Sequence, residues 1–174
     1  MPSYRSATSA DLDACWALRT RALQIGCAAH YPAEMLAALC ASPPPPSMPG
    51  LLAAGAAIVA EEDGHPVGYA VLDGASGEVE AVFVAPEWQG RGIALQLLAR
   101  LEALAAGRKL PRLFLSASLN AVPVYERAGF ARVRKELQPH RSGIALASVF
   151  MEKQLNRDSS GFNASELDSP PDRR

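Results

Sequence analysis

The residues best suited to chemistry lie in a short glycine-containing loop near the middle of the chain. An apolar, strand-like run ends at Pro86, and the segment Gln89-Gly90-Arg91-Gly92-Ile93-Ala94 then leads into a leucine-rich helical pattern. A loop that enters a helix directs unpaired backbone N–H groups and the positive end of the helix dipole toward one point. Gly90 and Gly92 let the main chain approach a ligand closely, and Arg91 adds a positive charge. The loop therefore predicts a site for an anion such as a phosphate.

The spacing in this loop excludes two common phosphate-binding motifs. A P-loop requires G-x-x-x-x-G-K-[ST], and the dinucleotide fingerprint G-x-G-x-x-G requires a third glycine where this chain has Leu95. The pattern that is present, Gln89-x-x-Gly92-x-Ala94, resembles the pyrophosphate loop of the GNAT superfamily of acyl-CoA-dependent N-acetyltransferases. A second block, from Ser118 to Phe130, resembles the Asn, Tyr and Gly-Phe signature of that family. The resemblance covers roughly Ser3 to Leu155.

This resemblance implies a cosubstrate, acetyl-CoA, and the residues that hold it. The backbone of the strand Val82-Phe83-Val84 would pair with the pantetheine arm like an added strand. Asn120 matches a further position that contacts the cosubstrate, although an asparagine there could equally serve only as a helix N-cap. The pyrophosphate would accept hydrogen bonds from the loop, whose matching positions are Gln89, Gly90, Arg91, Gly92, Ile93, Ala94 and Leu95.

The resemblance also suggests catalytic residues. Acetyl transfer needs an uncharged amine, a polarised thioester carbonyl and a proton for the departing thiolate. Tyr125 matches the tyrosine that many family members use as the proton donor, and the alternative is that its ring only packs. Glu80 and Glu78 are candidates for the base and share one strand face by simple alternation, unless a bulge intervenes or both only face solvent. The region from His30 to Glu34 matches the part of the family fold that shapes the acceptor pocket.

Hydrophobic periodicity predicts the elements that position these groups. Four consecutive prolines, 43–46, predict a stiff connector between two of them. The resemblance implies a GNAT-like mixed α/β fold, with a central, mostly antiparallel twisted sheet of about six to seven strands flanked by helices. Strands are predicted at 4–7, 56–62, 67–72, 78–84, 113–117, 130–135 and 148–153, and helices at 12–28, 32–39, 92–106 and 121–128.

The composition of the whole chain excludes several classes of protein. Its 174 residues are 49% hydrophobic and 20% charged, which is typical of a globular protein with one core. Seventeen Lys and Arg against eighteen Asp and Glu give a net charge of −1, so a nucleic-acid partner is not expected. The longest nearly apolar stretch, Leu51–Ala60, is about half as long as a membrane span. Because the N-terminus also lacks the pattern of a signal peptide, a cytoplasmic location is expected.

The chain is expected to form one domain without a metal. Residues 1–155 are predicted to be the GNAT N-acetyltransferase domain, and residues 156–174 a disordered, polar C-terminal tail rich in Ser, Asp and Pro. Cys15, Cys27 and Cys40 are too widely spaced for a structural zinc site. We therefore expect reduced cysteines and no metal.

The sequence thus predicts an acyltransferase that moves an acetyl group from acetyl-CoA to a primary amine of a small molecule or protein, by direct attack in a ternary complex. Two alternatives stay open: a catalytically silent acyl-CoA-binding sensor or interaction module, and an α/β phosphate-binding protein unrelated to CoA. The sequence does not identify the acceptor. Edge strands and Ala-rich helices are compatible with a homodimer.

Overall fold

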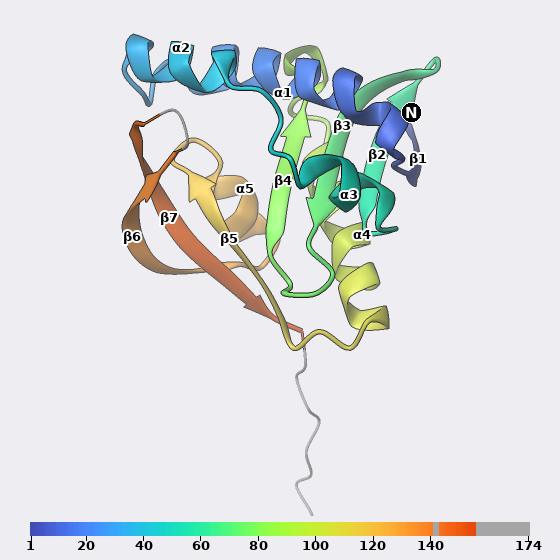
Figure 1. Ribbon diagram of the computed structural model, residues 1–174. Coiled ribbons are helices and arrows are strands. Elements are labelled where there is room, and N and C mark those ends of the chain that lie inside the picture. Colours follow the sequence, from blue (N-terminus) through green and yellow to red (C-terminus); the bar gives the residue numbers. More distant parts are fainter. Residues whose placement is uncertain (141–142, 156–174) are drawn as a thin grey trace, which may run out of the picture.

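A computed structural model describes residues 1–140 and 143–155, so the predicted tail lies outside the described residues. The described residues form seven strands, and Figure 1 shows helices on both sides of them, which confirms the predicted mixed α/β fold. Short 3-10 turns at Ser9–Asp11 and Pro86–Trp88 precede α1 and α4. In chain order the elements are β1 (Ser3–Ser6), α1 (Leu12–Gly26), α2 (Ala33–Ala41), α3 (Met48–Ala53), β2 (Ala57–Glu62), β3 (His65–Leu72), β4 (Val79–Val84), α4 (Ile93–Gly107), β5 (Arg112–Ser118), α5 (Val122–Arg127), β6 (Ala131–Pro139) and β7 (Ala145–Gln154).

The strands form two antiparallel sheets, one in the order β1-β2-β3-β4 and the other in the order β5-β7-β6. Within the described residues, a single parallel bridge between Glu78 and Phe114 joins β4 to β5. Next to it, the backbone N–H of Phe114 donates to the Gly77 carbonyl over 3.1 Å. Figure 1 shows the two strands adjacent where they begin and separating toward their carboxyl ends. The predicted central sheet is therefore divided between β4 and β5.

Gly77 makes this close approach possible. Its φ is +88°, and a Cβ added to it would lie 2.5 Å from the backbone oxygen of Arg112. A side chain at Gly77 would therefore be strained in its own conformation and would also collide with the first residue of β5. Glycine is required at the point from which the two strands diverge.

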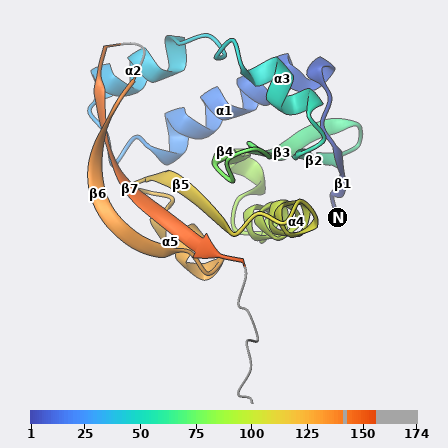
Figure 2. The same ribbon diagram turned by 60° about the horizontal axis from the view of Figure 1, so that its bottom comes forward.

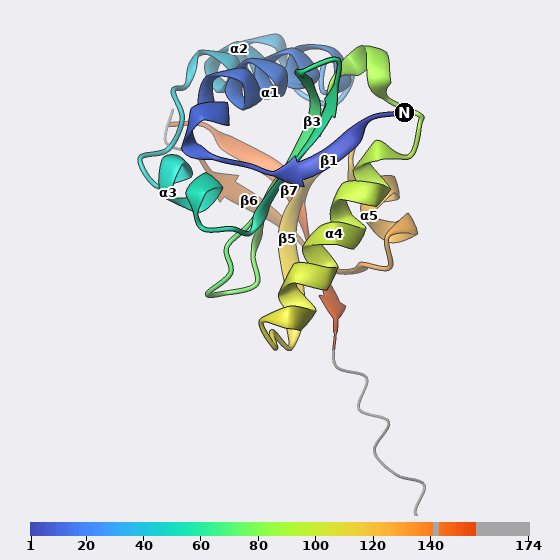
Figure 3. The same ribbon diagram turned by 90° about the vertical axis from the view of Figure 1, so that its right-hand side faces the viewer.

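Helices bury both faces of the first sheet, and Figure 2 shows the resulting layers. Leu97 and Leu101 of α4 pack against one face, while Leu18 of α1 and Leu52 of α3 belong to the cluster on the other. Burial on both faces explains why β2 and β3 have nearly continuous apolar sequences. Figure 3 shows α4 and α5 on the same side of the molecule, where they also pack against the second sheet, for example through Met151.

Helix α3 was not predicted from the sequence. It has only six residues, and short helices owe most of their stability to tertiary packing. Met48 and Leu52 are buried against α1 and the first sheet, and two positions do not define a helical period.

The hairpin formed by β6 and β7 is longer than the sequence predicted. β6 continues to Pro139 and β7 begins at Ala145, where the expected strands were 130–135 and 148–153. Most residues of β6 are exposed, so the additional pairs carry no apolar alternation that would reveal them in the sequence.

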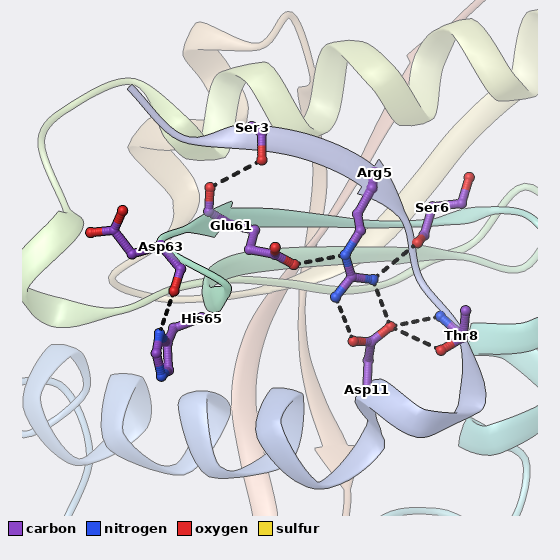
Figure 4. A network of polar contacts seen from close by, with 8 residues as sticks. All are labelled: Ser3, Arg5, Ser6, Thr8, Asp11, Glu61, Asp63 and His65. Carbon is purple, nitrogen blue, oxygen red and sulfur yellow. Dashed lines mark hydrogen bonds and ion pairs between the residues drawn. The ribbon is translucent and has the colours of Figure 1, made fainter.

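A polar network fixes the start of α1 to the first sheet (Figure 4). Arg5 on β1 donates two hydrogen bonds to the carboxylate of Asp11, over 2.8 and 2.9 Å, and a third to Glu61 on β2 over 2.7 Å. Asp11 also accepts the backbone N–H and hydroxyl of Thr8. The hydrogen bonds from Arg5 lower the pKa of Asp11 to about 2. The network therefore anchors the helix that forms one wall of the candidate site.

Candidate active site

The predicted anion loop lies at the N-terminus of α4. Gly90 and Gly92 have φ angles of +75° and +77°, in the left-handed region that favours glycine. Gly92 is the N-cap residue and α4 begins at Ile93. Within the described chain no side chain caps this helix, and its first turn contains no acidic residue. The first backbone N–H groups of α4 have no partner within the helix and are free to bind a ligand.

The loop faces open space. A Cβ added to Gly90 or Gly92 would meet no atom of the described chain within 4 Å. The side-chain amide of Gln89 donates to the Val84 carbonyl over 3.3 Å and ties the loop to the end of β4. The Arg91 guanidinium lies 4.4 Å above the ring of Trp88. Arg91 thus stacks beside the loop and does not line the adjacent cavity.

A cavity of about 300 Å³ connects this loop with the opening between β4 and β5. Its walls are the end of β4, the start of α4, the segment from β5 to α5, and Ala22, Leu23 and Cys27 from the C-terminal part of α1. The structure brings most of the predicted site residues together here: Val82, Phe83, Val84, Gln89, Gly90, Gly92, Ile93, Ala94, Leu95, Asn120 and Tyr125 all line this first cavity.

The edge of β4 that faces this cavity pairs with no other strand of the described residues at positions 82–84. The Ala85 N–H donates to the Val67 carbonyl, and Phe83 pairs with Tyr69 in the same antiparallel ladder. In such a ladder every second residue directs its N–H and C=O away from the neighbouring strand. The backbone groups of Val82 and Val84 therefore point away from β3 toward the opening. The Val84 carbonyl already accepts from Gln89, and the other groups are placed to pair with an extended ligand.

Tyr125 and Asn120 lie on the opposite wall. Tyr125 is buried, its ring packs edge-on against Phe130 at 5.8 Å, and burial raises the pKa of its hydroxyl. The phenol is therefore protonated at neutral pH. Asn120 is not the N-cap of α5, because Ala121 occupies that position. Its side-chain oxygen instead accepts a hydrogen bond from the Cys27 thiol over 3.3 Å.

A second cavity of about 410 Å³ adjoins the first. Leu23, Cys27, Phe83 and Ser118 line both, so these residues mark the junction. The second cavity extends beneath α1, between β4 and the tip of the β6–β7 hairpin. Glu80 belongs to its wall, whereas Glu78 lines neither cavity.

A bulge in β4 separates the two glutamates. Val79 and Ala81 pair with Leu72 and Val71, so Glu80 has no partner on β3. Val79 and Ala81 consequently pack into the clusters on opposite faces of the sheet, and simple alternation fails at this point. Glu80 is exposed, yet partial desolvation by the surrounding protein is the main cause that raises its pKa, and the negative charges of Glu78 and Asp73 add to it. A carboxylate with a raised pKa is a stronger base than an ordinary glutamate.

Trp16 and Arg19 line the second cavity and were not singled out as site residues in the sequence, whereas Tyr31 lies in the segment 30–34 that the resemblance associated with the acceptor pocket. Trp16 and Arg19 lie on α1, and the Arg19 guanidinium is 4.2 Å from the centre of the Trp16 ring. Tyr31 donates its hydroxyl to the Ala147 carbonyl and accepts the Leu119 N–H, so it links the helical layer to the second sheet. The spacing of Trp16, Arg19, Leu23 and Cys27 places them on one helix face, which is the signal that could have found Arg19.

Two features are absent from the described residues, 1–140 and 143–155. No group of three or more His, Cys, Asp or Glu side chains there could hold a metal ion. No helix of that part of the chain has the length and apolar character needed to cross a membrane.

A family model of the GNAT acetyltransferase domain matches residues 46–155. This chain belongs to the GNAT acetyltransferase family. The match begins just before α3 and includes both strands that diverge, the glycine loop and Tyr125. The GNAT resemblance inferred from the loop and from the block 118–130 is therefore confirmed. No match to a curated protein was found.

Solved structures of other GNAT proteins share the fold. A GCN5-related N-acetyltransferase (aminotransferase, class II) from Rhodopseudomonas palustris is 25% identical with a TM-score of 0.75, covering 89% of this chain and 96% of its own. The PaiA N-acetyltransferase from Thermoplasma acidophilum, solved with coenzyme A, is 15% identical with a TM-score of 0.68, covering 88% and 99%. A phosphinothricin acetyltransferase from Sinorhizobium meliloti, solved with AcCoA, is 21% identical with a TM-score of 0.64, covering 92% and 91%.

Proposed function

We propose that this GNAT protein transfers an acetyl group from acetyl-CoA to a primary amine, with both substrates bound at once. The observation that carries the proposal is the first cavity, in which an uncapped helix N-terminus and the unpaired edge of β4 lie next to each other. Family membership and the CoA and AcCoA bound to two structural neighbours support acetyl-CoA as the donor.

The residues present fit this cosubstrate. Its pyrophosphate would accept hydrogen bonds from the backbone N–H groups of residues 90–95, where Gly90 and Gly92 leave open space. Its pantetheine arm carries amides that would pair with the backbone of Val82 and Val84. Gln89 would hold the loop against β4, and Asn120 would contact the arm from the opposite wall.

Acetyl-CoA supplies an activated thioester, and the chain's own groups would manage the protons. Glu80 would take a proton from the acceptor ammonium in the second cavity and so provide a neutral amine. As the new N–C bond forms and the C–S bond breaks, the attacking nitrogen would lose its second proton to solvent, and the phenol of Tyr125 would give its proton to the departing thiolate and regain one from solvent. The two cavities meet at Leu23, Cys27, Phe83 and Ser118.

Titration calorimetry with acetyl-CoA tests the cosubstrate directly. Gly92→Asp would place a negative charge at the N-terminus of α4, and we expect it to abolish binding. Gly64→Asp is the matched control, because Gly64 has the same φ of +77° and the same open surroundings but lies in the turn between β2 and β3. No binding to folded wild-type protein, or equal loss in both variants, would refute the proposal.

Thiol release with a panel of amines tests turnover. We expect release above the rate of hydrolysis for at least one amine. Tight binding of acetyl-CoA without acetylation of any amine would instead support a catalytically silent acyl-CoA sensor.

A further inference from the structure

The second cavity combines charge and shape in a way that defines the class of acceptor. We propose that it binds a small amine that also carries a carboxylate and an apolar or aromatic body, with the carboxylate against Arg19. This inference rests on the proposed function, since it names the acceptor for the same site.

The walls of the second cavity favour an apolar body of limited size. Trp16, Tyr69 and Phe83 contribute aromatic surface, and the rings of Tyr69 and Phe83 stack with their centres 5.7 Å apart. The volume of about 410 Å³ lies within the ~300–1,000 Å³ that is usual for small-molecule sites. Tyr31 ties the adjoining segments together through its two hydrogen bonds. An acceptor that fills this space is a small molecule with a substantial apolar part.

Arg19 gives this apolar space a specific positive charge. Its side chain lines the second cavity although the residue is only 8% exposed. One guanidinium nitrogen donates to the Leu39 carbonyl over 3.2 Å, and the group lies over the Trp16 ring, 4.2 Å from its centre. These contacts fix its orientation, so little freedom is lost when a ligand binds. A planar guanidinium matches the two oxygens of a carboxylate, and the attraction is strong where water is scarce.

The positions along α1 and β4 fit a ligand with both charges. Arg19 precedes Leu23 by four residues and Cys27 by eight, which places it about 6 and 12 Å along the helix from the two junction residues. A small molecule whose carboxylate meets Arg19 can therefore present its amine at the junction with the first cavity. Glu80 on the β4 wall supplies the negative charge that an ammonium group needs as it enters.

The test compares amines that differ in the carboxylate alone. Phenethylamine, which has no carboxylate, is the reference. Phenylalanine adds a carboxylate near the amine, and 4-(2-aminoethyl)benzoate adds one far from it, on the ring. With saturating acetyl-CoA, we expect kcat/KM for at least one of the two acids to exceed that for phenethylamine by about tenfold or more. The methyl ester of the preferred acid should fall back to the level of phenethylamine. Equal or better use of phenethylamine would overturn the inference.

Two arginine variants provide the matched control. Arg19→Met should raise KM for the acids by about tenfold or more and leave phenethylamine nearly unchanged. Arg21→Met changes an exposed arginine on the same helix, paired with Glu87, and should leave the preference for the acids intact. An equal loss with acids and with phenethylamine in a folded Arg19→Met protein would contradict a role in binding carboxylates. The comparison of ligands on the wild-type protein stands even if Arg19→Met does not fold.

Calorimetry separates this inference from the proposed function. If the full chain does not bind acetyl-CoA, the proposed function fails. If it binds CoA, but neither acid binds the CoA-loaded protein at about 10 mM, well above the range of a weak millimolar ligand, the acceptor inference fails while the cosubstrate assignment stands.

Discussion

At the scale of single residues, a substitution of Tyr125 distinguishes a role in catalysis from a role in packing alone. Its ring packs edge-on against Phe130, and the residue lines the first cavity. Tyr125→Phe keeps the ring and removes the proton, so we expect turnover to fall by about 10²–10⁴-fold with the affinity for acetyl-CoA unchanged. Steady-state kinetics together with calorimetry measure the two quantities. Unchanged turnover in this variant would show that Tyr125 is not the acid.

The pH dependence of the rate distinguishes Glu80 on β4 from Glu78, the residue just before that strand. Because its pKa is raised, Glu80 becomes deprotonated only above the ordinary range of a glutamate, and activity should rise with pH through that step. Glu80→Gln should lower the plateau of kcat/KM and remove this limb of the profile. Glu78→Gln removes a neighbouring negative charge, so the limb should move to lower pH with the plateau retained. If Glu78→Gln instead lowers the plateau, Glu78 has the larger role.

Ser148 is buried although its side chain is polar. Its hydroxyl on β7 is the buried side-chain group for which the described residues provide no hydrogen-bond partner. Ser148→Ala should therefore raise the free energy of unfolding by about 0.5–1 kcal/mol, measured by urea denaturation. Ser116→Ala is the control, because the Ser116 hydroxyl donates to Glu136 and accepts from Gln138, and its loss should destabilise. A loss of stability in Ser148→Ala would indicate an unrecognised polar partner.

At the scale of elements, α1 is held in place by ionic contacts at its start. Asp11 has its pKa lowered to about 2 by Arg5, so the protein gains stability while Asp11 is charged. That contribution is complete above pH ~4, the ordinary aspartate value, and is lost as pH falls toward 2; we expect about 1–2 kcal/mol. Urea midpoints between pH 2 and 5 measure it. Asp11→Asn should reduce the slope in this window, and an unchanged slope would locate the acid sensitivity elsewhere.

The elements that carry a strong period were predictable from the sequence. The helix expected at 92–106 corresponds to α4, and the glycine loop lies at its start because the turn chemistry and the apolar period agree. Features that depend on tertiary contact were not predictable in the same way. The division between β4 and β5 depends on the approach of Gly77 to Arg112, and the orientation of Glu80 depends on a bulge. Arg19 is a charged residue within an apolar helix face, and this was a local signal of the second cavity in the sequence. Assigning Arg19 to a cavity nevertheless required knowledge of how α1 packs over β4.

At the scale of the whole molecule, the net charge of −1 opposes an anionic ligand only weakly, because the proposed attraction is local. The binding of acetyl-CoA should therefore stabilise the entire chain. At about one hundred times Kd the gain is about 2.7 kcal/mol, which corresponds to a rise in Tm of about 5–10 °C for a chain of this size.

ATP is the informative competitor in this thermal experiment. It offers phosphates to the N-terminus of α4 but has no pantetheine arm to pair with Val82 and Val84. We therefore expect ATP to raise Tm much less than acetyl-CoA at the same concentration, and CoA to approach acetyl-CoA. An equal rise in Tm with ATP and with acetyl-CoA would mean that the glycine loop alone determines binding. It would show that the edge of β4 is not part of the site and would favour a phosphate site unrelated to CoA.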